Sequence, residues 1–357
     1  QIGGCITEIA TDKARILIDL GQNLPNGEGL VDDDLASQEA IVNITQGIDA
    51  IFYTHYHGDH LGLFHYVPDN IPQYIGKVAK QIALCKHQQL SYIKGRDAYM
   101  FLIEADRKRI LHTGDFRGHG YLSKGLLPTI KKLILSQGKI DFLITEGTML
   151  SRFGERVMSE NELQKEAGEI MKRYKNVFVM CSSTDMERLA SFYVANKRQR
   201  YRPLVCDRFQ KNIFEIFSKS AGSLTPLFRF DNAYDFGLTN TKLLDWMKDK
   251  GFCMFVRATD KFKDYYQALI SQLTPNDTVL IYSMWKEYIN DNGKHATQRY
   301  IDFVSMFPHM EKLHTSGHAS TESLAEVCNL VNPTLGIIPI HSENSANYSK
   351  LPIDEHL

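Results

Sequence analysis

Three histidines and an aspartate lie within six residues of one another, in the stretch T-H-Y-H-G-D-H at 54–60. The stretch follows the apolar run 48–53, which predicts a buried strand. Side chains alternate along an extended chain, so His55 and His57 share one side, and a turn at Gly58 can bring Asp59 and His60 round to face them. Imidazole and carboxylate suit zinc or a similar divalent ion, and these four groups leave room for two ions. Two ions about 3.5–4 Å apart can hold a hydroxide and polarise a phosphoryl or carbonyl oxygen. The alternative, a solvated loop that happens to be rich in histidine, requires four ligands this close together by accident.

At these residues the chain resembles the metallo-β-lactamase-fold hydrolases, whose H-x-H-x-D-H signature matches His55, His57, Asp59 and His60. Four later segments of the chain make the resemblance more specific, to one group within this family. They are T-G-D-F with Asp115, an apolar strand that ends in Glu146, S-G-H-A with His318, and an apolar strand that ends in His341. In this order, with a domain-sized insertion between the second and the third, they are similar to the β-CASP nucleases, most closely to the ribonuclease J branch. The resemblance covers nearly the whole chain.

The resemblance implies an α/β protein, with a metallo-β-lactamase αββα sandwich and an inserted β-CASP-like α/β domain. Residues 1–149 and 313–357 form the first domain, and residues 150–312 form the second. It also implies a ligand set in which His55 and His57 bind one ion, Asp59, His60 and His341 bind the other, and Asp115 bridges them. The ions are expected to be zinc, with manganese as the alternative.

The activity that the resemblance implies is hydrolysis of RNA phosphodiester bonds by a hydroxide that two metal ions activate. The catalytic residues are Asp59, Glu146 and His318: His318 protonates the leaving oxygen, and Glu146 keeps it oriented and charged. One alternative is a hydrolase of the same fold that acts on a small ester, thioester or cyclic phosphate. Another is a non-catalytic RNA-binding relative that has lost a ligand.

One ligand of the family pattern has no counterpart. The family supplies a histidine at the end of the strand before the bridging acid, and the window 92–97 contains none. His87 is further upstream, on a predicted helix over 76–92. Either the first metal site has one ligand fewer, or the chain as read lacks a loop that carries the histidine. We favour the second, because the sequence begins at Gln1 and not at methionine. Normal Cα spacings of about 3.8 Å at every step from 86 to 97 would exclude a missing loop.

The predicted insertion opens with an amphipathic helix over 160–175, a strand over 176–180 and a small polar turn. Strand, turn, helix and strand form a βαβ unit, and the free amides of the helix N-terminus can hold an anion. We therefore predict a phosphate-binding group, with capping of the helix by Ser183 or Thr184 as the alternative. Its members are Ser182, Ser183, Thr184 and Arg188, together with Ser316 of the later motif.

The remaining elements position the motifs. Segments 3–9 and 15–21 predict a hairpin, and Asp19 at its end either fixes a ligand histidine or is a simple turn acid. A helix is expected over 36–44, a loop over 61–75, and two strands over 98–103 and 109–112. His112, next to the T-G-D-F segment, is interpreted as a strand-packing residue in preference to a ligand.

The amino-acid composition excludes few classes of function. The 41 basic and 42 acidic residues nearly cancel, so contact with RNA has to come from a local groove. The six cysteines are scattered, mostly within apolar runs, which predicts reduced core cysteines in a cytoplasmic protein. There is neither an apolar run of about 18 residues nor a leader, so we expect no membrane insertion. A homodimer is compatible with the sequence.

Overall fold

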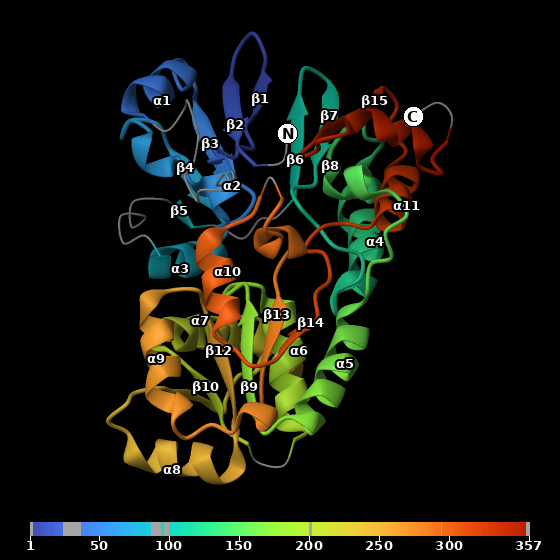
Figure 1. Cartoon of the computed structure of the whole chain (residues 1–357). Helices are drawn as coiled ribbons and strands as arrows, with labels where there is room; N and C mark the ends of the chain where they lie inside the picture. Colours follow the sequence, from blue (N-terminus) through green and yellow to red (C-terminus); the bar gives the residue numbers. More distant parts are fainter. Residues whose placement is uncertain are drawn as a thin grey trace. The chain divides into compact units, whose positions relative to one another are not determined.

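The structure is a computed structural model that describes residues 3–23, 37–86, 94–95, 100–199, 202–293 and 295–354. The chain divides into two compact units (Figure 1). Of the described residues, those up to 157 and from 316 onwards form unit 1, and those from 158 to 315 form unit 2. The domain boundaries 149/150 and 312/313 stay a prediction.

The first sheet of unit 1 has five strands in the order β1-β2-β3-β4-β5. The pair β1 and β2 is the predicted antiparallel hairpin, and the other neighbours run parallel. The expected loop over 61–75 is wrong at its end, because residues 73–75 form β4 beside β3. Three residues are too few for an alternating pattern to appear in the sequence. The strands are β1 Thr7–Ala10, β2 Arg15–Ile18, β3 Ala50–Tyr53, β4 Gln73–Ile75 and β5 Lys94–Gly95.

The second sheet of unit 1 has four strands in the order β15-β8-β7-β6. The strands β6 and β7 form a hairpin whose turn residues, Asp106 and Arg107, both have positive φ, as a two-residue primed turn requires. The strands β7, β8 and β15 run parallel. Their bounds are β6 Phe101–Ala105, β7 Lys108–His112, β8 Phe142–Glu146 and β15 Gly336–Ile340.

Helices cover the outer faces of the two sheets. Buried residues of α1 and α3 pack on Leu17, Ile51 and Tyr53 of the first sheet. Buried residues of α11 pack on Leu111 and Leu143 of the second. Between the sheets, the rings of Phe52 and Phe101 lie edge to face at 5.9 Å. This is the predicted αββα sandwich (Figure 1). The helices are α1 Gln38–Ile44, α2 Gly58–Leu61, α3 Lys77–Lys86, α4 Leu126–Thr129 and α11 Thr321–Val331. Residues 87–92 of the predicted helix over 76–92 lie outside the described ones.

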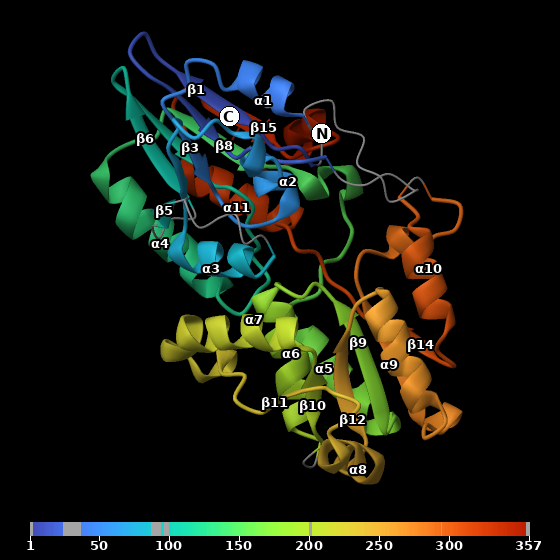
Figure 2. The same ribbon diagram turned by 90° about the vertical axis from the view of Figure 1, so that its left-hand side faces the viewer.

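Unit 2 contains a parallel sheet with the order β11-β10-β12-β9-β13-β14. Phe262 of α9 and Phe303 of α10 belong to the same buried cluster as Phe178 on one face of the sheet, and Phe255 on the other face contacts Phe192 of α6. Figure 2 shows α9 and α10 on one side of this sheet and α6 on the other. The strands are β9 Asn176–Cys181, β10 Leu204–Cys206, β11 Ala233–Asp235, β12 Phe252–Val256, β13 Thr278–Ser283 and β14 Met310–Lys312. The helices are α5 Glu160–Arg173, α6 Met186–Lys197, α7 Arg208–Lys219, α8 Thr241–Lys250, α9 Asp260–Ile270 and α10 Gln298–Ser305. The predicted helix and strands around 160–206 are confirmed, with β12 lying between β9 and β10.

None of the helices in the described ranges is both long enough and apolar enough to cross a membrane.

Candidate metal centre

The H-x-H-x-D-H residues lie where β3 ends and the short helix α2 begins. His57 is the N-cap of α2, and Asp59 and His60 belong to its first turn. The side chains converge: His55 Nε2 lies 2.9 Å from His57 Nδ1, and His60 Nε2 lies 3.9 Å from the Asp59 carboxylate. The ring centroids of His55 and His60 lie 4.0 Å apart, so the turn at Gly58 does bring the second pair of side chains towards the first pair.

Asp115 reaches the same place from the end of β7. Its Oδ2 lies 3.2 Å from His60 Nε2. Gly114, with φ at 59°, turns the chain there, and its N–H donates to Nδ1 of His112 over 3.1 Å. His112 is fully buried, and its ring contacts Phe101 at 6.5 Å. In the described part of the chain it belongs to none of the groups that can hold a metal ion. It therefore supports the loop that carries Asp115.

His341 follows β15 and adopts a positive φ of 49°, which is uncommon outside glycine. Its Nε2 lies 3.1 Å from Asp59 Oδ2, and its Nδ1 lies 2.8 Å from Thr148 Oγ1. Thr148 follows Glu146 in the chain and was not singled out in the sequence. An outer partner of this kind fixes the tautomer and the direction of a ligand ring.

Asp19 contacts a histidine of the cluster, which is the first of the two roles predicted for it, and is not a simple turn acid. Its Oδ2 lies 2.8 Å from His60 Nδ1, and its Oδ1 accepts the Thr54 N–H over 2.7 Å. The residue has φ at 63° and is buried, so its backbone is strained where the side chain is needed. His60 is thereby oriented with Nε2 towards Asp115.

The side chains in this part of unit 1 fit a metal ion. Three overlapping groups place one ligand atom each within 4.8 Å of the others: Cys5 with His60 and His341, His55 with His60 and Asp115, and Asp115 with His318 and His341. Within the described chain, buried His60 Nε2 and Asp115 Oδ1 have no hydrogen-bond partner. Buried polar atoms are normally paired, so atoms that converge without hydrogen-bond geometry are suited to coordination. The His and Asp set supports zinc.

Opposite charges in the cluster stabilise one another. Burial acts to lower the pKa of His60, but the carboxylates of Asp115 and Asp19 outweigh it, and the pKa lies well above its usual value. Burial acts to raise the pKa of Asp115, yet the charges of His60 and His318 hold it well below the ordinary range. The pKa of His55 is lowered by burial and by the neighbouring His60. Carboxylate and neutral imidazole are the forms that metals bind, so Asp115 and His55 are already in that form, whereas His60 has to release a proton when a metal binds.

His318 and Glu146 form a pair beside these candidate ligands. His318 Nδ1 lies 3.2 Å from Glu146 Oε2 and 3.4 Å from Asp115 Oδ2. Glu146 is fully buried, and its Oε1 accepts the backbone N–H groups of Phe116 and Ala319 over 2.9 and 3.3 Å. Burial acts to lower the pKa of His318, but the charges of Glu146 and Asp115 raise it to about 9. The imidazole is therefore held in its protonated form at neutral pH.

The phosphate-binding candidates lie elsewhere in the chain. The N-cap of α6 is Asp185, whose side chain accepts the Arg188 N–H over 3.1 Å, so capping by Ser183 or Thr184 is wrong. The Arg188 guanidinium is buried, bonds Glu160 at 3.0 Å, and donates to Ser283 and Thr315, so it is already engaged by protein groups. In unit 1, Ser316 Oγ accepts the His318 N–H over 3.1 Å.

The window without a histidine, residues 92–97, lies outside the described residues apart from the backbone of 94–95, as does His87. The Cα spacings that would test for a missing loop therefore also lie outside the described residues, and the missing loop stays a prediction.

Two packed sheets covered by helices are the architecture of a metallo-β-lactamase-fold protein, so the predicted fold class is confirmed. Residues 306–349 match the RMMBL family, described as a Zn-dependent metallo-hydrolase RNA specificity domain. That segment contains His318 and His341, and the match supports the metallo-β-lactamase and β-CASP superfamily.

One similar solved structure is the crystal structure of a protein of unknown function from Enterococcus faecalis V583. The TM-score is 0.67 and the identity 18%, over 97% of this chain and 93% of that chain. At this identity the likeness shows the fold. A search of curated proteins found no match.

Proposed function

We propose that the chain is a metal-dependent ribonuclease that hydrolyses RNA phosphodiester bonds and is related to the ribonuclease J branch. The observation that carries the proposal is the position of His318. Its Nδ1 lies between the carboxylates of Glu146 and Asp115, and Asp115 also faces His60. A proton donor therefore stands next to a cluster of metal ligands, which is what metal-assisted hydrolysis needs.

Two divalent ions complete the proposed site. His55 and His57 would hold one, Asp59, His60 and His341 would hold the other, and Asp115 would be shared by both; zinc is the expected metal and manganese the alternative. Bound there, such ions lower the pKa of water and polarise a phosphoryl oxygen. Asp59 stays ionised, because the hydrogen bond with His341 and the charge of His60 outweigh burial and keep its pKa below the usual value.

His318 is the general acid of the proposed reaction. Its Nδ1 faces Glu146, so Nε2 is the nitrogen that gives a proton to the leaving oxygen. Glu146 is the positioning residue. Two backbone amides fix Oε1 of its carboxylate, and Oε2 keeps the imidazole protonated and in place. Tyr348 also donates to the backbone carbonyl of Glu146, which fixes the end of β8.

RNA is the proposed substrate because the matched domain is described by its RNA specificity, and because the acid and one ligand lie within the matched residues. Ser316 on the S-G-H-A loop, and Ser182, Ser183 and Thr184 before α6, are kept as proposed phosphate contacts. We do not keep Arg188, since its guanidinium is buried against Glu160.

The test is incubation of the chelated protein with end-labelled RNA and with DNA of the same sequence, before and after zinc or manganese is restored. RNA should be cleaved only after metal addition. Cleavage of DNA alone, or of a small ester in place of either, would overturn the choice of substrate. Bound RNA that stays intact with metal present would indicate a non-catalytic binding protein.

A substitution of His318 tests its role as general acid separately from metal binding. His318→Ala should keep its metal content, cleave about 10²–10⁴-fold more slowly, and recover in part on a substrate whose leaving group needs no proton. His309→Ala, at an exposed histidine of unit 2, is the control and should cleave normally. Loss of metal from His318→Ala would show that His318 is a ligand and not the acid.

A further inference from the structure

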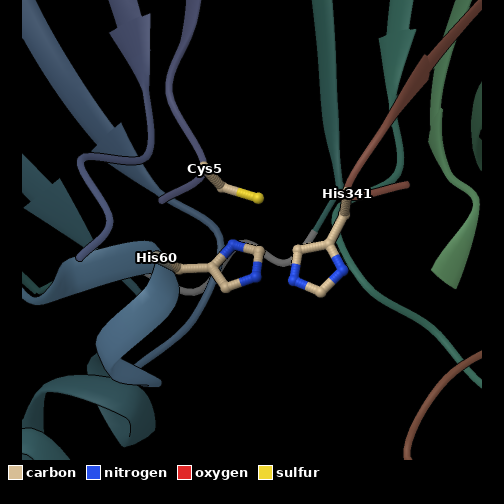
Figure 3. A group of neighbouring side chains, drawn as sticks. All are labelled: Cys5, His60 and His341. Atoms are coloured by element: carbon tan, nitrogen blue, oxygen red, sulfur yellow. The ribbon is translucent and has the colours of Figure 1, made fainter. Parts of the chain in front are cut away.

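Cys5 lies at the metal centre and not in a hydrophobic core. The sequence predicts a reduced core cysteine, and the side chain is indeed buried, with 8% exposed. Its neighbours, however, are polar. Sγ and one ring nitrogen each of His60 and His341 lie within 4.8 Å of one another. The three side chains come from the segment before β1, from α2 and from the end of β15, and they point towards one another (Figure 3).

The backbone fixes the position of this sulfur. Cys5 N–H donates to the Asp59 carbonyl over 2.9 Å, and the Cys5 carbonyl accepts the Gly21 N–H over 2.9 Å. The segment can lie this close because residue 21 is a glycine: a methyl group there would overlap the Asp59 carbonyl. Gly4, with φ at 60°, turns the chain immediately before Cys5. The thiol is therefore held rigidly against the H-x-H-x-D-H segment, as a ligand has to be.

The two histidines direct their inner ring nitrogens towards the Asp59 carboxylate, at 3.9 Å from His60 Nε2 and 3.1 Å from His341 Nε2. Asp19 occupies Nδ1 of His60 at 2.8 Å, so Nε2 is directed inward, where it is fully buried and has no hydrogen-bond partner within the described residues. Thr148 occupies Nδ1 of His341 at 2.8 Å, and Nε2 faces Asp59. Ligand histidines are oriented in this way by a partner on the outer nitrogen.

We propose that Cys5 Sγ coordinates the metal ion that His60 and His341 hold, so that with Asp59 and the shared Asp115 the ion has one thiolate, two imidazoles and two carboxylates. The inference rests on the metal centre of the proposed function. Coordination breaks the S–H bond, releases the proton to solvent, and forms a metal–sulfur bond with the sulfur electron pair. A thiolate is a soft ligand, so Cys5 favours zinc or cobalt over manganese or magnesium at this position.

X-ray absorption at the zinc edge tests the proposal on the unaltered, zinc-loaded protein. A zinc ion with Cys5 as a ligand has a sulfur neighbour at about 2.3 Å beside nitrogen and oxygen neighbours at about 2.0–2.2 Å. Zinc bound with nitrogen and oxygen neighbours alone would overturn the role of Cys5 and leave the proposed function standing. Failure of the protein to bind zinc at all would overturn both.

A substitution identifies which cysteine supplies the sulfur neighbour of the zinc ion. Cys5→Ser should lose the sulfur neighbour, lose the sulfur-to-cobalt charge-transfer band of the cobalt-loaded protein, and bind zinc at least about tenfold more weakly. Cys85→Ser is the matched control, because Cys85 belongs to the same unit, is partly exposed on α3, and donates to the Gln81 carbonyl. It should keep both signals. A band that persists in Cys5→Ser would refute the assignment.

Discussion

Glu146→Gln should convert the proposed ribonuclease into one whose activity fails at alkaline pH. The glutamine Oε1 can still accept the N–H groups of Phe116 and Ala319, so the end of β8 should keep its structure. At the other atom, an amide N–H replaces the carboxylate oxygen that faces His318 Nδ1 at 3.2 Å. That amide favours the neutral imidazole, because it donates to an unprotonated nitrogen.

The magnitude follows from the pKa of His318. The carboxylates of Glu146 and Asp115 outweigh burial and raise this pKa from 6.5 to about 9, and Glu146 has the larger effect of the two. An acid with a pKa of about 9 is about nine-tenths protonated at pH 8, whereas one at about 6.5 is about 3% protonated. With the pKa of His318 back at its ordinary value of 6.5, the variant should cleave RNA about 30-fold more slowly at pH 8. At pH 6 both forms are mostly protonated, so the loss there should be small.

The assay is the rate of RNA cleavage by the metal-loaded protein from pH 5.5 to 9, with metal content measured at each point. The rate falls as pH rises through the pKa of the acid, so the falling limb of the variant should move towards lower pH. Glu326→Gln, at an exposed glutamate of α11, should follow the unaltered protein. A loss of equal size at pH 6 and pH 8 would refute the argument that Glu146 acts through the protonation of His318.

Two further predictions concern the ligands and unit 2. Asp115→Ala should weaken zinc binding at least about tenfold and abolish cleavage, while His112→Ala should reduce zinc binding and cleavage far less. Metal analysis of the two variants is the measurement. Equal metal loss in both would mean that the roles of the residues at the end of β7 are wrongly assigned. Glu160→Gln should destabilise unit 2 by about 3–5 kcal/mol in urea unfolding, because it leaves the buried Arg188 charge without a counter-ion. The exposed pair of Glu169 with Lys172 provides the control: Glu169→Gln should leave the midpoint nearly unchanged, and a similar midpoint in both variants would contradict the role of the buried pair.

The sequence predicts well the parts of the site that are local. The four residues of 55–60 converge because alternation and one turn suffice, and Asp115 and Glu146 follow apolar strands whose parallel carboxyl ends share an edge. Pairing of Glu146 with His318 joins residues 172 positions apart, and only the resemblance brings them together. No local pattern contains such a contact.

Three features of the structure could not be predicted from the sequence, each for a physical reason. Cys5 looks like a core residue because its neighbours in the chain are apolar or glycine, while its neighbours in space are histidines. Thr148 is one of many threonines, and only the fold places it on His341. Arg188 lies one turn into a helix after a polar loop, as a phosphate ligand would, but the buried Glu160 from α5 engages it.

The strand β15 has a consequence for the order in which the chain becomes active. It pairs with β8, yet residues 158–315 of unit 2 are synthesised between the two strands. A nascent chain that has emerged as far as residue 315 carries His55, His57, Asp59, His60 and Asp115 but has neither His318 nor His341. On the proposed function, the ribosome, which is itself made of RNA, therefore faces an incomplete enzyme until the last segment of unit 1 leaves the exit tunnel. Interrupting translation within unit 2 would release an inert fragment.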